Sequence, residues 1–183
     1  MNTTRRNAIK QCFIITVGTA LVPACMQDKT KPSIVLKNVN LQGKEEELLA
    51  EISETIIPPT ATPGAINALV PIFILRVVDD LYTPEEQQQF VKGMKAFDKF
   101  ARDKLEISFI AAGLPQREEL LTGILDSNGK DIPENIKSFL KTMKKLTVQG
   151  YMSSKHYLTK VRVYELVPGR FHGCIPVATS IRK

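Results

Sequence analysis

From residue 44 onward, apolar residues recur at spacings of three and four, the period of helices that bury one face. In the first such stretch, Leu48, Leu49, Ile52 and Ile56 form the apolar stripe and acidic residues fill the first turn. Helices are expected at about 44–56, 69–81, 84–105, 114–125, 133–146 and 153–165. Near the end of the last stretch, Val161, Val163 and Tyr164 also fit a strand. The pattern predicts an all-α fold, a compact helical domain of about five to seven helices.

Local signals mark where several of these helices start and stop. Thr83 can cap a helix, Pro84 suits its first position, and Glu86 stands where a capping-box acid reaches back to the cap. Pro58 and Pro59 end the helix before them, because proline cannot continue the backbone hydrogen-bond ladder. The segment P-P-T-A-T-P-G-A at 58–65 is therefore expected to be a rigid loop.

The first 24 residues have a different pattern, typical of an export signal. Arg5 and Arg6 stand in T-R-R-N-A-I-K, which resembles a twin-arginine motif, and an apolar run over 12–24 follows. That run is too short to span an ~30 Å hydrocarbon core. It ends in V-P-A-C, so Cys25 resembles the lipidated cysteine of a lipoprotein. Ordinary cleavage near Ala24 without a lipid is the alternative.

These features predict three regions: a signal over 1–24, a tether over 25–43 and a helical domain over 44–183. The mature protein is expected outside the cytoplasm, in the periplasm or cell envelope, with a lipid anchor on a membrane. The tether is expected because residues 26–43 are polar and lack a clear period, although a short extended piece around 33–36 is possible on the pattern.

Charge and cysteine content change once the signal is set aside. Residues 1–24 hold three of the 25 basic residues and none of the 19 acidic ones, which leaves 22 basic against 19 acidic residues. The basic residues alternate with acids along helices, so no nucleic-acid-binding pattern is present. Of three cysteines, only Cys174 remains beyond Cys25, so an internal disulfide within the domain is not expected.

No sequence pattern indicates a catalytic, cofactor-binding or metal-binding site in this chain. G-x-G-x-x-G and C-x-x-C-H are both absent, and His156 and His172 are the only histidines. His172 and Cys174 could act as base and nucleophile, or could simply be a surface residue and a buried thiol. Likewise Asp79, Asp80, Glu85 and Glu86 read as a helix end and a helix start rather than as paired catalytic carboxylates.

Four blocks of sequence resemble the gluconate 2-dehydrogenase subunit 3 family. They are E-T-I-I-P-P-T-A-T-P-G-A (54–65), D-D-L-Y-T-P-E-E-Q (79–87), G-Y-M-S-S (150–154) and V-P-G-R-F-H-G-C-I-P (167–176), in the family's order. The resemblance implies a small subunit of an oxidoreductase complex. Its partner would be an FAD-containing flavoprotein of the glucose–methanol–choline type, often accompanied by a multihaem cytochrome c. The small subunit itself is not expected to carry the flavin.

Such a subunit would serve export, assembly and stability of the flavoprotein, and it needs a docking surface. The proline-rich loop and the apolar segment 167–177 are the candidates, because rigid apolar loops lose little conformational entropy on docking. Alternatively, these loops cover the domain's own core. Two other functions stay open: a free-standing lipid-anchored binding or structural protein, and an enzyme acting through Cys174. The residues expected at the interface are Pro58, Pro59, Pro63, Tyr151, Tyr164, Pro168, Phe171 and Pro176.

Overall fold

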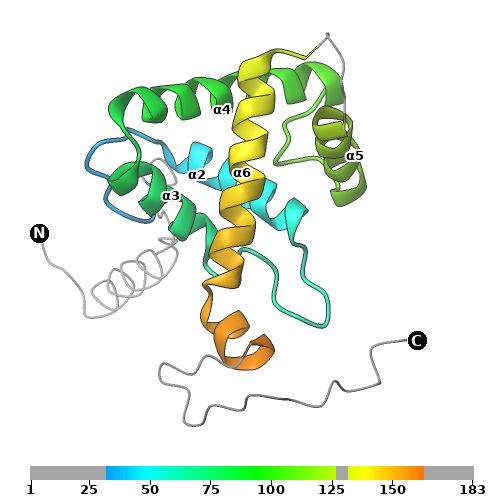
Figure 1. Ribbon diagram of the computed structural model, residues 1–183. Coiled ribbons are helices and arrows are strands. Elements are labelled where there is room, and N and C mark those ends of the chain that lie inside the picture. Colours follow the sequence, from blue (N-terminus) through cyan, green and yellow to red (C-terminus); the bar gives the residue numbers. More distant parts are fainter. Residues whose placement is uncertain (1–31, 127–131, 163–183) are drawn as a thin grey trace, which may run out of the picture.

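The computed structural model describes residues 32–126 and 132–162, which form a bundle of helices (Figure 1). This part of the chain contains no strand, so the expected all-α class is confirmed. Within the last expected helix, Tyr157–Val161 form a π-helical turn, so the strand alternative is wrong for Val161. Val163 and Tyr164 lie outside the described residues. The helices are α2 (Gly43–Ile56), α3 (Val70–Leu81), α4 (Pro84–Leu105), α5 (Leu114–Asp126), α6 (Glu134–Met152) and η1 (Tyr157–Val161).

Helix starts and stops follow the local signals closely. At the start of α4, the Thr83 hydroxyl accepts a bond from the Glu86 amide at 3.3 Å, and the Glu86 carboxylate accepts one from the Thr83 amide at 2.9 Å. These two bonds satisfy amides that a helix start otherwise leaves without partners. Helix α2 ends at Ile56, two residues before Pro58.

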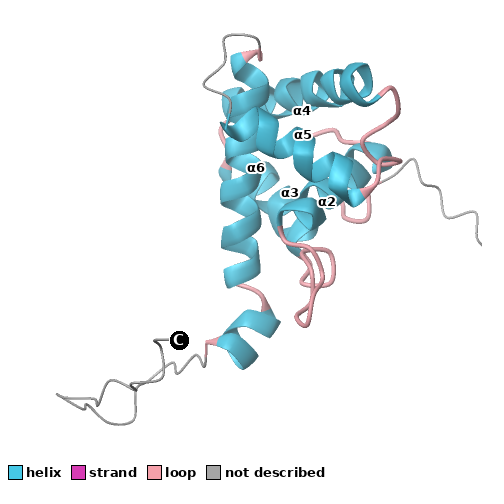
Figure 2. Cartoon of the chain, turned by 90° about the vertical axis from the view of Figure 1, so that its right-hand side faces the viewer, coloured by secondary structure: helices cyan, strands magenta, loops and turns pink. Residues whose placement is uncertain are grey.

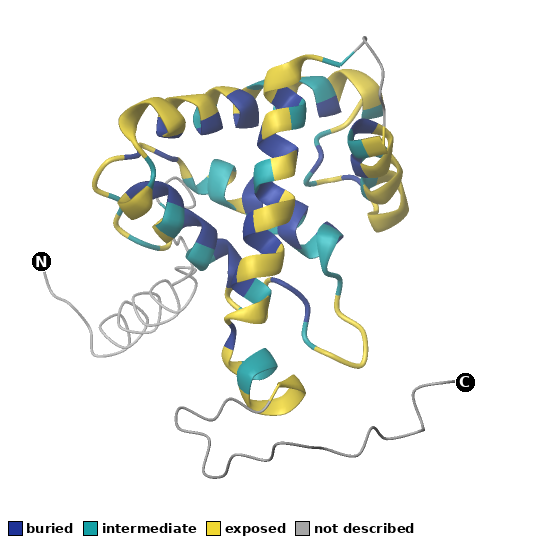
Figure 3. Ribbon diagram, viewed as in Figure 1, coloured by how far each residue is buried: buried dark blue, intermediate teal, exposed yellow. Residues whose placement is uncertain are grey.

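Helix α6 crosses the whole domain on one side. In Figure 1 it runs down the front, α4 lies across the top, and α2 and α3 pass behind it. The quarter-turned view in Figure 2 places α6 at one edge of the domain and the other helices on one side of it. Helix α6 contacts α2, α3, α4 and α5. Figure 3 shows its buried residues on the side facing these helices and its exposed residues on the other.

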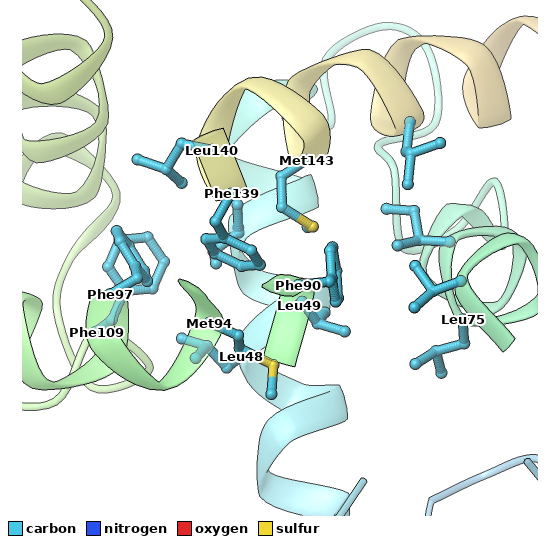
Figure 4. Close-up of a cluster of buried hydrophobic side chains, with 14 of the residues drawn as sticks. Leu48, Leu49, Leu75, Phe90, Met94, Phe97, Phe109, Phe139, Leu140 and Met143 are labelled. Carbon is cyan, nitrogen blue, oxygen red and sulfur yellow. The ribbon is translucent and has the colours of Figure 1, made fainter. Parts of the chain in front are cut away.

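An aromatic cluster fills the crossing of α4 and α6 (Figure 4). The Phe139 ring lies 5.1 Å from the Phe90 ring and 5.9 Å from the Phe97 ring, measured between centroids. Phe97 in turn meets Phe109, from the α4–α5 connection, edge to face at 5.2 Å. Edge-to-face rings gain from their quadrupoles as well as from burial. The cluster therefore joins α4, α6 and the α4–α5 connection into one core.

Two glycines let α6 approach its neighbours closely. A Cβ on Gly93 would lie 2.7 Å from the Phe139 Cβ and 2.9 Å from the Asn135 carbonyl oxygen. A Cβ on Gly150 would lie 2.7 Å from a Phe73 ring carbon. The helix expected over 133–146 stops before Gly150, but α6 continues through Gly150 to Met152. Because Gly150 has no side chain, the Phe73 ring of α3 can pack directly against the α6 backbone.

Part of the segment expected as a tether is held to the domain. Val39 and Leu41 are buried in the core, and the buried Asp79 carboxylate accepts bonds from three successive backbone amides. These amides belong to Lys37, Asn38 and Val39, at 2.8, 2.7 and 2.9 Å. Within the expected tether, residues 32–42 therefore pack on the helices, and residues 25–31 lie outside the described residues.

Candidate functional site

The loop between α2 and α3, residues 57–69, is fixed by hydrogen bonds at several points. The Ala65 amide donates to the Ile57 carbonyl at 3.0 Å, which closes the base of the loop. Within it, the Thr60 amide donates to the Thr62 carbonyl at 3.0 Å. Pro59 is exposed, whereas Pro58 and Pro63 are partly buried. This bonding is the kind that a rigid loop requires, and the loop presents Pro59 to solvent.

Glu54, on the last turn of α2, supports the second half of the loop. Its carboxylate accepts a bond from the Ile66 amide at 2.7 Å. Gly64 lies directly against that carboxylate, because a Cβ at Gly64 would come within 2.6 Å of Oε1. A residue with a side chain at 64 would therefore displace the carboxylate from the amide it bonds.

Tyr151 connects this loop to α6 and η1. Its hydroxyl donates to the Pro63 carbonyl at 3.0 Å, and its ring meets Tyr157 edge to face at 6.3 Å. Two blocks that lie far apart in the sequence, 54–65 and 150–154, thus meet at one end of the bundle. Pro63 and Tyr151, both expected at a partner interface, are brought together here.

Leu69 combines backbone strain with exposure at the end of this loop. It caps α3 with φ 60° and ψ 25°, the left-handed region, and its side chain is 63% exposed. A left-handed conformation costs a residue with a Cβ roughly 1–2 kcal/mol. Strain of this kind is concentrated at functional sites. The periodic pattern from which the helix was predicted contains no signal for this conformation.

More apolar surface lies nearby, on the loop and at the end of α6. Ile66 is 38% exposed, and Val148 and Met152 are 40% and 44% exposed. Two polar atoms in the same part of the chain, Thr147 Oγ1 and His156 Nε2, are buried without a hydrogen-bond partner among the described residues. We call the loop 57–69, Val148, Tyr151 and Met152 the loop end. Exposed apolar side chains beside a rigid loop suit protein docking.

A separate cleft of about 420 Å³ lies between the first halves of α4 and α6. Tyr82, Glu86, Lys92 and Glu134 are among the residues that line it. Burial, and then the nearby Glu86 carboxylate, raise the pKa of the Tyr82 hydroxyl. The residues that line it are mostly polar and include neither histidine nor cysteine.

Several residues predicted from the sequence lie outside the described residues. These are Arg5, Arg6 and Cys25 of the export signal, His172 and Cys174, and the interface candidates Tyr164, Pro168, Phe171 and Pro176. Across 32–126 and 132–162, no group of three or more His, Cys, Asp or Glu residues is arranged to hold a metal ion. The helices in the same ranges include none long and apolar enough to cross a membrane.

Comparison with known proteins adds one match, at the level of a family. No curated protein and no solved structure matches the chain. The model of the family described as gluconate 2-dehydrogenase subunit 3 matches residues 43–169. This range starts at the first residue of α2 and includes the loop end. It also contains the first three of the four sequence blocks. The chain therefore belongs to the gluconate 2-dehydrogenase subunit 3 family.

Proposed function

We propose that this chain is the non-catalytic small subunit of an exported, flavin-dependent dehydrogenase that oxidises a sugar or polyol. The observation that carries the proposal is the family match over residues 43–169, because the family is described as a subunit of gluconate 2-dehydrogenase. A subunit of a dehydrogenase complex has oxidoreductase partners. The partner proposed here is a flavoprotein of the glucose–methanol–choline type that binds FAD, with a c-type cytochrome as a third subunit in some complexes.

In this division of labour the chain supplies docking surface and the flavoprotein supplies the chemistry. The loop end is the proposed centre of the interface. Its backbone is already held by the Glu54–Ile66 and Tyr151–Pro63 bonds, so docking costs little conformational entropy. Leu69 and Ile66 add exposed apolar side chains. A stable complex needs about 1,600 Å² of total buried surface, more than this loop alone offers. The segment 167–177, with Phe171, is proposed to complete it.

The export signal gives the small subunit a second role. The twin-arginine route carries folded proteins, and a flavoprotein acquires its cofactor in the cytoplasm. A flavoprotein without its own signal can cross the membrane when docked to a subunit that carries Arg5 and Arg6. Cys25 would then hold the complex to the membrane through a lipid, on the periplasmic or cell-envelope side.

The first test is purification of the full-length tagged protein from its native membranes in mild detergent, with mass spectrometry and an absorbance spectrum. We expect a flavoprotein in stoichiometric amount, with the absorbance bands of its bound flavin at about 370 and 450 nm. A colourless protein recovered alone at several salt and detergent concentrations would contradict the proposal. That result would favour a free-standing lipid-anchored binding or structural protein.

Substitutions then locate the interface. Leu69→Asp removes exposed apolar surface without new backbone strain, because Asp tolerates the left-handed region. Phe171→Asp tests the segment 167–177. Leu81→Asp is the matched control, since Leu81 is 75% exposed at the opposite end of α3. We expect the first two to reduce recovery of the flavoprotein at least about tenfold, a loss of about 1.4 kcal/mol, and the control to leave it unchanged. Equal recovery with all three variants would place the interface elsewhere.

A further inference from the structure

We propose that the outer face of α6 docks onto an acidic surface of the flavin-binding subunit, an inference that rests on the proposed function. The face is defined by five residues, each three or four positions from another member: Lys141, Lys144, Lys145, Val148 and Met152. We call it the lysine stripe. It lies opposite the buried residues of α6, on the side that Figure 3 shows as exposed.

The positive charge of the lysine stripe is not neutralised within the described residues. Three ion pairs are present there, Lys95–Glu45, Arg102–Asp98 and Arg117–Glu51, and none involves Lys141, Lys144 or Lys145. Over its whole length α6 carries one acid, Glu134. Like charges three and four residues apart on a helix repel one another, so the stripe is electrostatically unfavourable in the isolated chain. An acidic partner surface would relieve that repulsion.

Negative charge gathers on a different helix. Helix α2 carries five glutamates and one lysine; it lies behind α6 in Figure 1 and to the right of α6 in the turned view of Figure 2. Glu45 and Glu51 are paired with Lys95 and Arg117, so it is the remaining glutamates of α2 and the lysines of the stripe that separate negative from positive charge. Charge separated in this way orients an approaching partner and speeds its association.

The shape of the stripe suits a protein partner. The three lysines, Val148, Gln149, Met152 and Ser153 line a shallow, mainly apolar hollow at the C-terminal half of α6. An apolar centre with a charged rim is the common arrangement of protein interfaces. The hollow shares Val148 and Met152 with the loop end, and Tyr151 bonds the same half of α6 to Pro63. One partner could cover both.

The position of the N-terminal segment argues against the membrane as the occupant. Figure 2 shows the start of the described chain on the side of the domain away from α6. A lipid on Cys25 would be seven residues from Pro32, a span of at most about 25 Å. A domain of this length is about 35 Å across. A bilayer held by that lipid would therefore lie near the far side, and the lysine stripe would point toward the aqueous phase.

The test uses the full-length chain and the flavoprotein that co-purifies with it, separated and titrated against each other. The variant is Lys141→Glu/Lys145→Glu. The matched control, Lys44→Glu/Lys99→Glu, makes the same change in net charge at exposed lysines on α2 and α4. We expect the variant to raise Kd about tenfold at 50 mM NaCl and less than about threefold at 500 mM, because salt screens the charges. A photo-reactive benzoylphenylalanine in place of Lys145 should cross-link to an Asp- and Glu-rich segment of the flavoprotein.

The possible failures are distinguishable. If the complex forms but the variant and control bind equally at both salt concentrations, the inference about α6 is overturned and the proposed function stands. If no flavoprotein co-purifies, the proposed function fails. The variant is then compared with the parent protein on vesicles of 70% phosphatidylcholine and 30% phosphatidylglycerol. Binding that the variant loses would assign the stripe to the membrane and overturn the inference.

Discussion

The α4–α6 crossing and the loop end are built in opposite ways, although α6 contributes to both. At the crossing, Phe90, Phe97 and Phe139 are buried ring against ring, and Gly93 lets the two backbones meet. At the loop end, Leu69 is left-handed and exposed, and Met152 faces solvent. The two buried polar atoms without partners, on Thr147 and His156, also belong to this part of the chain.

The contrast separates residues that stabilise the domain from residues that a partner would use. Burying apolar surface at the crossing contributes about 25 cal/mol per Å². Exposed leucine and methionine side chains at the loop end contribute little of this kind, and the strain at Leu69 opposes folding. Substitutions should therefore have large effects on stability at the crossing. At the loop end they should have small or even stabilising effects on the isolated chain and larger effects on partner binding.

Removing the central ring of the crossing should have the largest effect. We expect Phe139→Ala to lower the free energy of unfolding by about 3–5 kcal/mol, since it removes contacts with two other rings and leaves a cavity. Urea unfolding followed by circular dichroism measures this. Met152→Ala on the same helix is the control, with an expected change within about 0.5 kcal/mol. If the two variants lost similar free energies of unfolding, the crossing would not be more important for stability than the loop end.

Removing the Asp79 contact with residues 37–39 should have the second-largest effect on the free energy of unfolding. Asp79→Ala leaves three backbone amides without their acceptor, and we expect a loss of about 2–3 kcal/mol. Asp80→Ala, at the exposed neighbouring position, is the control and should change little. Equal losses for the two would show that the 37–39 contact does not stabilise the domain.

The same contact predicts a pH dependence. Burial raises the pKa of the Asp79 carboxyl, but bonds from the three amides and the charge of Lys37 outweigh burial and lower it overall from 3.8. A carboxyl with a lowered pKa in the folded state stabilises the protein above its unfolded pKa. The difference between parent and Asp79→Ala should be full above about pH 4 and shrink as the pH falls through the lower, folded-state pKa. A difference that grows on acidification would contradict this assignment.

The strained residue at the loop end should respond in the opposite direction. We expect Leu69→Gly to raise the free energy of unfolding by about 1 kcal/mol, because glycine adopts φ 60° without steric cost. Glu106, which ends α4 at φ 59°, provides a matched control. Glu106→Gly should stabilise by a similar amount. Only Leu69→Gly should also weaken flavoprotein binding, because only it removes a side chain from the proposed interface.

The smallest effect is expected for the bond between Tyr151 and Pro63. Tyr151→Phe removes the hydroxyl and keeps the ring packed against Tyr157, so we expect a loss of about 0.5–1 kcal/mol. Tyr157→Phe, with its ring in the same pair, is the control. Amide hydrogen exchange at Ala65 should accelerate in Tyr151→Phe if the bond holds the loop in place. Unchanged exchange would mean that the other bonds of the loop, from Ile57 and Glu54, hold it without Tyr151.

Much of the helical framework follows from interactions that are local in the sequence. The capping box at Thr83 and Glu86 involves residues three apart, and the stop at Pro58 needs only the chemistry of one residue. The loop 57–69 could be predicted as rigid from its prolines. Its connection to Tyr151 could not, because that bond joins residues 88 apart in the sequence. The family resemblance covered the blocks that contain the loop and Tyr151, but it did not indicate that the two are in contact.

Two further features of the fold have the same physical origin. Gly150 reads as a helix break when only its propensity is considered, but the nearness of Phe73 decides that it is a packing residue within α6. Residues 37–39 look like part of a polar tether, but Asp79, some 40 residues away, supplies the acceptor their amides need. Neither partner is visible in a local window of the sequence.

The amino-acid sequence by itself therefore determined the helical class, most helix boundaries and the family. Periodicity, caps and prolines act within a few residues, so a linear pattern contains them. Only the tertiary structure decided that Gly93 and Gly150 allow close helix contacts and that Leu69 is left-handed and exposed. The tertiary structure also decided that the Asp79 carboxylate binds the backbone amides of residues 37–39. These features depend on which surfaces meet when the helices pack, and that is set by the whole fold together.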